Sequence, residues 1–166
     1  MKRTIAILLL TALLLSGCAS GSELEDNPTF YYLRREILYG SDDGVIAGEA
    51  RELASDLPLA DLLSLYMAGP AEEGLILPFP ADTRITDVQI AGNTVTLTLS
   101  AEMAGLQGMD LSIACACLGY TCFSLTDAET VTIKAPAGKR GIQVLYTVTR
   151  DSFLLYDNTT KAADAS

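Results

Sequence analysis

The residues best suited to chemistry are three cysteines in the second half of the chain: Cys115, Cys117 and Cys122. Thiolates bind soft metal ions and act as nucleophiles. The chain contains no histidine, which excludes Ser-His and Cys-His activation and most zinc sites. On one helix, Cys115 and Cys122 would lie about 20° apart, whereas Cys117 would point away from both. We therefore predict no metal site and no cofactor, and we interpret the cysteines as small buried apolar residues.

Paired carboxylates are the second candidates, because two of them can supply the acid and base of a glycosidase. Three pairs occur in segments with the composition of turns: Asp42-Asp43, Glu72-Glu73, and Asp151 with Asp157. Nothing in these segments indicates desolvation, so we interpret the pairs as solvated loop charges. The sequence predicts no catalytic residue and a protein that is not an enzyme.

Two adjacent cations, Arg34 and Arg35, follow two tyrosines, Tyr31 and Tyr32. Such a strip could bind an anionic polymer. Charges on an edge strand also discourage sheet aggregation, which explains the same residues without a ligand. The sequence leaves both interpretations open.

The N-terminus has the parts of a secretory signal. Lys2 and Arg3 precede an apolar run from Ile5 to Leu15, and the segment Leu15-Ser16-Gly17-Cys18 follows. The run is shorter than the roughly 20 apolar residues that span a bilayer. Its end resembles the lipobox of bacterial lipoproteins, which implies cleavage before Cys18 and diacylglycerol on the Cys18 thiol. The alternative is an ordinary signal that happens to contain a cysteine. We expect a protein anchored by lipid to the extracytoplasmic face of the cell membrane.

The remaining chain has the size of one domain. Residues 1–17 form the predicted signal peptide, residues 18–28 a flexible polar tether, residues 29–157 a single domain and residues 158–166 a disordered tail. The formal net charge of −10 disfavours nucleic acid as a partner and also disfavours binding to anionic lipid headgroups. An acidic surface suits a basic partner, or simply keeps the protein soluble.

Hydrophobic periodicity predicts the elements of the domain. A strand begins at residues 29–33, and residues 45–53 form a second strand or a helix. An apolar stripe predicts a helix over residues 57–68, capped by Ser55 or Asp56, and strict alternation predicts a hairpin over residues 88–100. A second helix covers residues 110–127, and Gly119 weakens its propensity so that packing must hold it. A strand over residues 129–135 and a hairpin of residues 142–148 with 153–156 complete the order.

This order predicts an α+β fold, a two-layer sandwich of one mostly antiparallel sheet with two helices on one face. The helix stripe and the hairpin face each need a cover. We therefore expect six residues to form a common core: Leu62, Leu63, Tyr66, Val95, Leu97 and Leu99.

Several of these segments together resemble a known protein family. The segments Leu62-Leu63 to Gly69-Pro70, Pro80-Ala-Asp-Thr83 and Val95-Thr-Leu97-Thr-Leu99-Ser100 resemble the sporulation and spore germination domain called GerMN, over about residues 29–135. The family often has glycine where this chain has Asp82, so the turn there is expected to differ. Members occur as lipoproteins and beside cell-wall amidases.

The resemblance implies a lipid-anchored binding or assembly module of the cell envelope, related to sporulation or germination. Its partners would be the membrane through the lipid, and an envelope protein or cell-wall component. Loops carry binding residues on rigid scaffolds, so we expect Glu72 and Glu73 in the Pro70–Thr83 loop to contact the partner. Two alternatives are an accessory or regulator of peptidoglycan hydrolysis and a lipoprotein that binds a small ligand.

Overall fold

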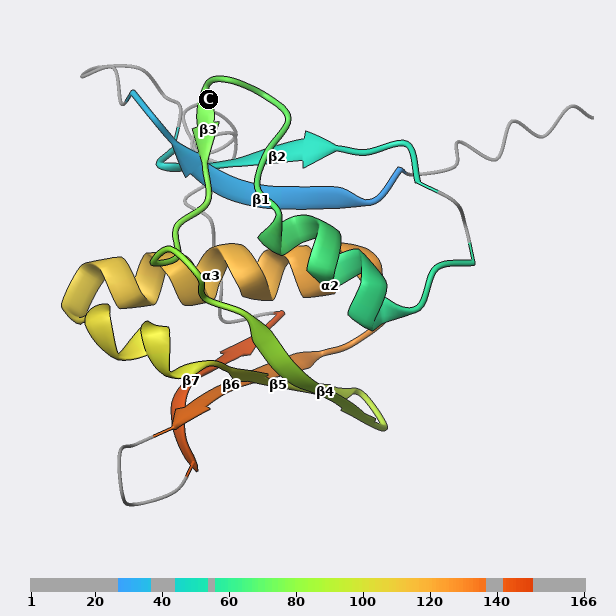
Figure 1. Cartoon of the computed structure of the whole chain (residues 1–166). Coiled ribbons are helices and arrows are strands. Elements are labelled where there is room, and N and C mark those ends of the chain that lie inside the picture. The colour runs from blue at the N-terminus through green and yellow to red at the C-terminus, as the bar shows by residue number, and fades with distance from the viewer. Residues whose placement is uncertain (1–26, 37–43, 54–55, 137–141, 151–166) are drawn as a thin grey trace, which may run out of the picture.

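Two β-sheets enclose the longer helix of the domain, as the computed structural model in Figure 1 shows. The structure describes residues 27–36, 44–53, 56–136 and 142–150. One sheet has the strand order β2-β1-β3 and the other has the order β4-β5-β6-β7. The elements are β1 (Thr29–Arg34), β2 (Ile46–Ala50), α2 (Leu59–Met67), β3 (Leu75–Ile76), β4 (Ile85–Ala91), β5 (Thr94–Leu99), the 3-10 helix η1 (Ala101–Gly105), α3 (Gly108–Leu125), β6 (Thr130–Pro136) and β7 (Ile142–Thr149).

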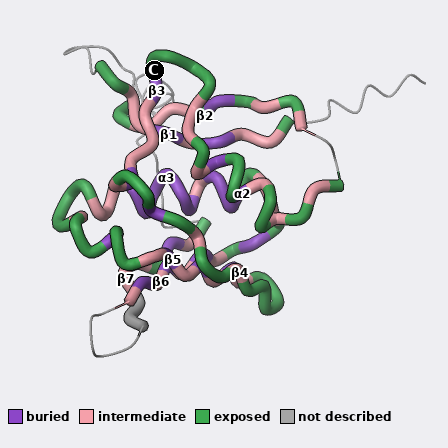
Figure 2. Tube along the Cα trace, in the orientation of Figure 1, coloured by how far each residue is buried: buried purple, intermediate pink, exposed green. Residues whose placement is uncertain are grey.

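The α+β class is confirmed, but the prediction of a two-layer sandwich with one sheet is wrong. The helix α3 is apolar around its whole circumference and therefore needs cover on both sides. The two sheets supply it, and Figure 2 shows buried positions along α3 between them. Nine residues of α3 are buried: Ala114, Cys115, Ala116, Cys117, Leu118, Gly119, Thr121, Cys122 and Phe123.

Glycine allows α3 to approach the four-stranded sheet closely. A Cβ atom added at Gly119 would lie 3.3 Å from both methyl groups of Val148 on β7. The low helix propensity of Gly119 is therefore offset by packing, as the sequence predicted. By length and composition α3 would also suffice to cross a membrane, but half of it is buried inside the domain, as in the core helix of a folded protein.

The predicted hairpin of β4 and β5 is confirmed, with Gly92 and Asn93 in its turn. The next strand, β6, pairs with β5 in parallel, because η1 and α3 cross over between them and return the chain in the same direction. The last described strand, β7, pairs with β6 in antiparallel orientation. The predicted partner segment, residues 153–156, lies outside the described residues.

The first sheet contains the segment that the sequence left between strand and helix. Residues 46–50 form β2 and pair with β1. From β1, Phe30 and Tyr32 are buried against α2, where the rings of Tyr32 and Tyr66 stack at 4.9 Å between centroids. The rings of Phe30 and Tyr66 meet in a T-shaped arrangement with 5.8 Å between their centroids.

The helix α2 is confirmed, with two details changed. Its N-cap position is Pro58, and no side chain caps it by a hydrogen bond. Five of the six predicted core residues have no exposed surface, whereas Leu62 is only half-buried. The helix ends at Met67 with Ala68 as its C-cap. Gly69 follows with a φ of 99°, the left-handed conformation that glycine adopts most readily just after a helix.

Candidate functional site

The Pro70–Thr83 loop is held at its start by a buried carboxylate. Glu49 on β2 is 8% exposed. Its Oε1 atom accepts hydrogen bonds from the backbone N–H groups of Ala71 and Glu72, each at 3.0 Å. Bonds to an ionised acceptor are stronger than neutral ones. The loop backbone is therefore fixed to the edge of the three-stranded sheet.

Arg51, two residues along the chain from Glu49, completes this contact. Its Nη2 atom donates to Glu49 Oε2 at 2.9 Å and to the Gly69 carbonyl at 3.0 Å. Its guanidinium lies 5.6 Å from the Phe30 ring centroid. Neither Glu49 nor Arg51 was predicted from the sequence. Their spacing of two residues favours one side of an extended segment, with Arg51 just beyond the end of β2, but the loop that they bind is distant in sequence.

The side chains of Glu72 and Glu73 are exposed on this fixed backbone. Glu73 lies beside the end of β1, where a hollow of about 450 Å³ is lined by Arg34, Arg35, Glu36, Glu73 and Gly74. The Arg35 N–H donates to the Gly74 carbonyl at 2.9 Å and holds the two segments together. The structure thus brings Glu73 beside Arg34 and Arg35, which the sequence alone does not connect.

The tyrosines that precede Arg34 and Arg35 do not extend this surface. Tyr32 has no exposed area, and its hydroxyl donates to the Tyr66 carbonyl at 3.1 Å. Tyr31 packs on Tyr120 with 5.3 Å between ring centroids. The two tyrosines therefore do not form one exposed surface with Arg34 and Arg35, which disfavours the interpretation of these four residues as a binding strip for an anionic polymer.

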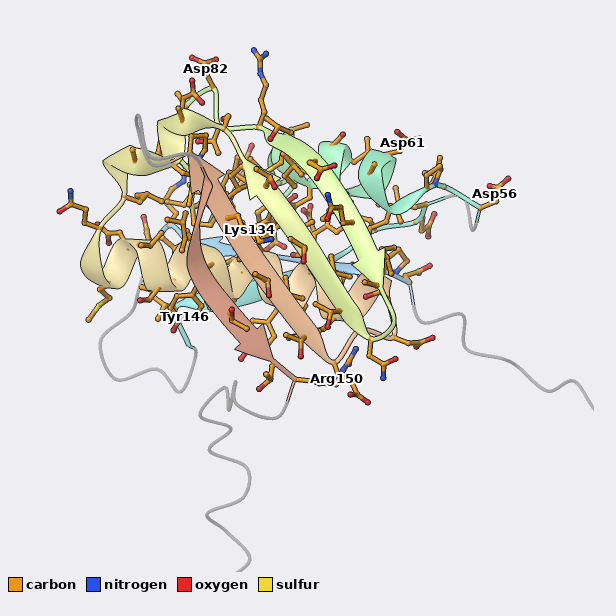
Figure 3. All side chains as sticks on the ribbon, turned by 90° about the horizontal axis from the view of Figure 1, so that it is seen from below. Asp56, Asp61, Asp82, Lys134, Tyr146 and Arg150 are labelled. Carbon is orange, nitrogen blue, oxygen red and sulfur yellow. The ribbon has the colours of Figure 1, made fainter. Side chains whose placement is uncertain are left out.

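At the opposite end of the domain, two adjoining hollows of about 480 and 400 Å³ share Phe123, Ser124 and Arg150. Figure 3 shows Arg150 at this end of the sheet and Asp82 at the other. The Arg150 guanidinium donates to the carbonyls of Phe123 and Thr126, each at 3.0 Å, and lies 5.0 Å from the Phe123 ring centroid. Its charge stabilises the C-terminal end of α3 and is not directed at a ligand.

The three cysteines are buried free thiols. Burial raises the pKa of each to about 12, so they remain protonated and weakly nucleophilic at neutral pH. Cys117 is buried like the others because α3 is covered on both sides. Within the described ranges, no group of three or more His, Cys, Asp or Glu residues could hold a metal ion.

Several predicted residues lie outside the described part of the chain, and their roles stay predictions. They are the lipobox residues Leu15, Ser16, Gly17 and Cys18 and the carboxylates Asp42, Asp43, Asp151 and Asp157.

A family model described as "Germane: Sporulation and spore germination" matches residues 29–136. The chain belongs to the Germane family. The match runs from β1 to the end of β6 and includes the Pro70–Thr83 loop, so the resemblance seen in the sequence is confirmed. This Germane domain matches no curated protein and no solved structure at a significant level.

The sequence predicted that the turn at Asp82, where the family often has glycine, would differ. The structure shows that Asp82 itself adopts the backbone conformation that glycine favours. In the Germane domain described here, Asp82 has a φ of 65°, in the region that favours glycine. The Thr83 N–H donates to the Pro80 carbonyl at 3.2 Å and closes the turn. Asp is among the few residues that tolerate this conformation.

Proposed function

We propose that this Germane domain is a lipid-anchored binding and assembly module on the extracytoplasmic face of a bacterial cell membrane, acting in sporulation or germination. Its family is one of sporulation and spore germination proteins. The segment Leu15-Ser16-Gly17-Cys18 supports the anchor. The observation that carries the binding role is the fixed loop, whose backbone is bound by Glu49 while Glu72 and Glu73 face solvent.

Pre-ordering of this kind favours binding. A loop that is rigid before association loses less conformational entropy when a partner binds. The acidic side chains on it suit a basic partner, and complementary charge accelerates encounter and excludes wrong partners. The buried protonated thiols and open loop carboxylates suit contact better than catalysis.

Anchoring is tested by Cys18→Ser. We expect the variant to lose incorporation of labelled palmitate and to remain uncleaved or leave the membrane. Stable anchoring needs two acyl signals, since one chain binds only marginally. A mature-sized Cys18→Ser protein that still fractionates with membranes would show that the lipobox interpretation is wrong.

The binding role is tested in the same cells by crosslinking the anchored protein and identifying what it contacts. The double variant Glu72→Lys, Glu73→Lys should keep its melting temperature and lose the crosslinked partner. Asp127→Lys with Glu129→Lys makes the same change in net charge at the opposite end of the domain and should keep the partner. Hydrolysis of cell walls by the purified protein would instead favour the alternative role in peptidoglycan hydrolysis.

A further inference from the structure

Two exposed apolar side chains lie on neighbouring elements. Among the described residues, four large apolar side chains are exposed; they include Leu65 on α2, at 40%, and Ile90 on β4, at 63%. The two elements are in contact, and Figure 3 shows α2 beside the outer edge of β4. Exposed apolar residues that gather in one place commonly mark an interaction site.

The position of Ile90 makes its exposure informative. Ile90 lies opposite Val95 in the hairpin register, and residues directly opposite each other lie on the same face of a sheet. Val95 is fully buried on the face that packs against the helices. Ile90 therefore lies on the inner, apolar face of the sheet, at an edge that α2 does not cover. We call Leu65, Ile90 and the outer edge of β4 the α2–β4 ledge.

The backbone of β4 is open at the same place. Among the described strands, β4 is an outermost strand of its sheet. In a hairpin with a two-residue turn, the flanking residues, here Ala91 and Thr94, form the hydrogen-bonded pair. Hydrogen-bonded and non-bonded pairs alternate, so Ile90 and Val88 direct their N–H and C=O groups away from β5. The segment from Asp87 to Ala91 contains no proline or lysine, the residues that commonly block an edge strand.

The charged side chains on the two elements of the ledge have one sign; the nearest cations along the sheet are Arg84, which precedes β4, and Lys134 on β6. Neither α2 nor β4 contains a lysine or an arginine, whereas Asp61 lies on α2 and Asp87 on β4. Asp56 precedes α2, and Figure 3 shows Asp56 and Asp61 at the side of the molecule where α2 flanks β4. With a net charge of −10, a second copy of this chain would be repelled at this surface.

We propose that the α2–β4 ledge docks an extended, basic segment of another protein, which pairs with β4 as an added strand. The proposal rests on the binding role proposed above. Side chains of a strand alternate between its two faces, so apolar residues of the segment would cover Ile90 and Leu65. Its lysine or arginine residues would lie on the opposite face, beside Asp87. Strand addition of this kind obtains affinity from backbone hydrogen bonds and specificity from alternate side chains.

The test uses the purified full-length protein in mild detergent and a synthetic peptide of alternating lysine and valine. The matched peptide replaces every lysine by glutamate. We expect the basic peptide to bind about tenfold or more tightly at low salt, and this preference to shrink at about 1 M salt because screening weakens exposed charge pairs. Hydrogen exchange should show protection of the Val88 and Ile90 amides on binding, with β7 unchanged.

Three variants separate the apolar contribution from the backbone contribution. Ile90→Thr keeps the N–H group and should weaken binding. Ile90→Pro also removes an N–H that makes no bond to β5, and it should abolish the protection of the Val88 amide. Met109→Thr removes an apolar side chain that is 76% exposed at the start of α3, and should change nothing. Melting temperatures confirm that each variant is folded.

Equal binding of the two peptides would overturn the proposal. So would protection at another strand, or self-association of the protein that depends on Ile90. The Glu72 and Glu73 experiment gives an independent result, because that loop and the ledge lie on different elements. If the Glu72→Lys, Glu73→Lys variant keeps the crosslinked partner while the basic peptide still binds at β4, the proposed loop is contradicted and the ledge is not. If that variant loses the partner but the two peptides bind equally, the ledge is contradicted and the loop is not.

Discussion

The contribution of single residues to stability can be tested one substitution at a time, and Asp82 is the first case. Asp82 has a positive φ of 65°, and a non-glycine residue pays roughly 1 kcal/mol for that conformation. We expect Asp82→Gly to raise the free energy of unfolding by about 0.5–1 kcal/mol, measured by urea denaturation. Ala81→Gly is the control, since Ala81 has no positive φ and glycine there should lower stability. A destabilising Asp82→Gly would show that the aspartate side chain, not the backbone, determines the turn.

Cys115 is the second residue whose environment makes a sharp prediction. It is fully buried in the core, where a hydroxyl would lack a water partner. Cys115→Ser should therefore lower the free energy of unfolding by about 1–3 kcal/mol. The folded wild-type protein should react slowly with a thiol reagent and rapidly after denaturation. Fast modification of all three thiols in the native protein would contradict the burial of Cys115, Cys117 and Cys122.

At the scale of elements, the carboxylate of Glu49 connects a strand to a loop. Glu49→Ala would leave the N–H groups of Ala71 and Glu72 without their acceptor and Arg51 without its ion pair. We expect a loss of about 2–3 kcal/mol in unfolding free energy, because unmade bonds to a charged group are costly. Hydrogen exchange at Ala71 and Glu72 should become faster. Glu52→Ala, at an exposed neighbour, should stay within about 0.5 kcal/mol of wild type.

The elements also show what the sequence could and could not predict. The alternation of Val95, Leu97 and Leu99 and the stripe of α2 each have one buried face, so their periodicity predicted them correctly. The helix α3 is buried on two faces, so the expectation that both helices lie on one face of a single sheet was wrong. The strand β3 has only two residues, too few for any period to appear.

The candidate site was predictable only in part, for a related reason. Composition indicated that Glu72 and Glu73 lie in an exposed loop, and the structure places them there. The contact of Glu49 with Ala71 joins residues far apart in sequence, and no local pattern records it. Arg35 and Glu73 line the same hollow because β1 pairs with β3. No local sequence pattern predicts that pairing.

For the whole molecule, the buried thiols predict a dependence of stability on alkaline pH. Burial raises the pKa of Cys115, Cys117 and Cys122 to about 12, above the value of roughly 8.5 in an unfolded chain. Above that value the unfolded state binds fewer protons than the native state, so stability falls with rising pH. We expect the urea midpoint to fall progressively from about pH 9 towards pH 12.

The control for this alkaline dependence is the triple variant Cys115→Ala, Cys117→Ala, Cys122→Ala. It should be less stable at neutral pH because small cavities replace the sulfur atoms, but its midpoint should fall less between about pH 8.5 and 10. An unchanged slope in this variant would show that other groups, such as the buried Tyr66, govern the alkaline response.

The position of α3 between the sheets has a consequence for folding. Both sheets pack against α3, so neither can complete its core while this helix is detached. The parallel pairing of β5 and β6 must also wait for the crossover that contains this helix. Folding should therefore be cooperative, without a stable half-molecule. Opening free energies measured by hydrogen exchange should be similar in the centres of both sheets, and proteolysis should yield no fragment that keeps one sheet intact.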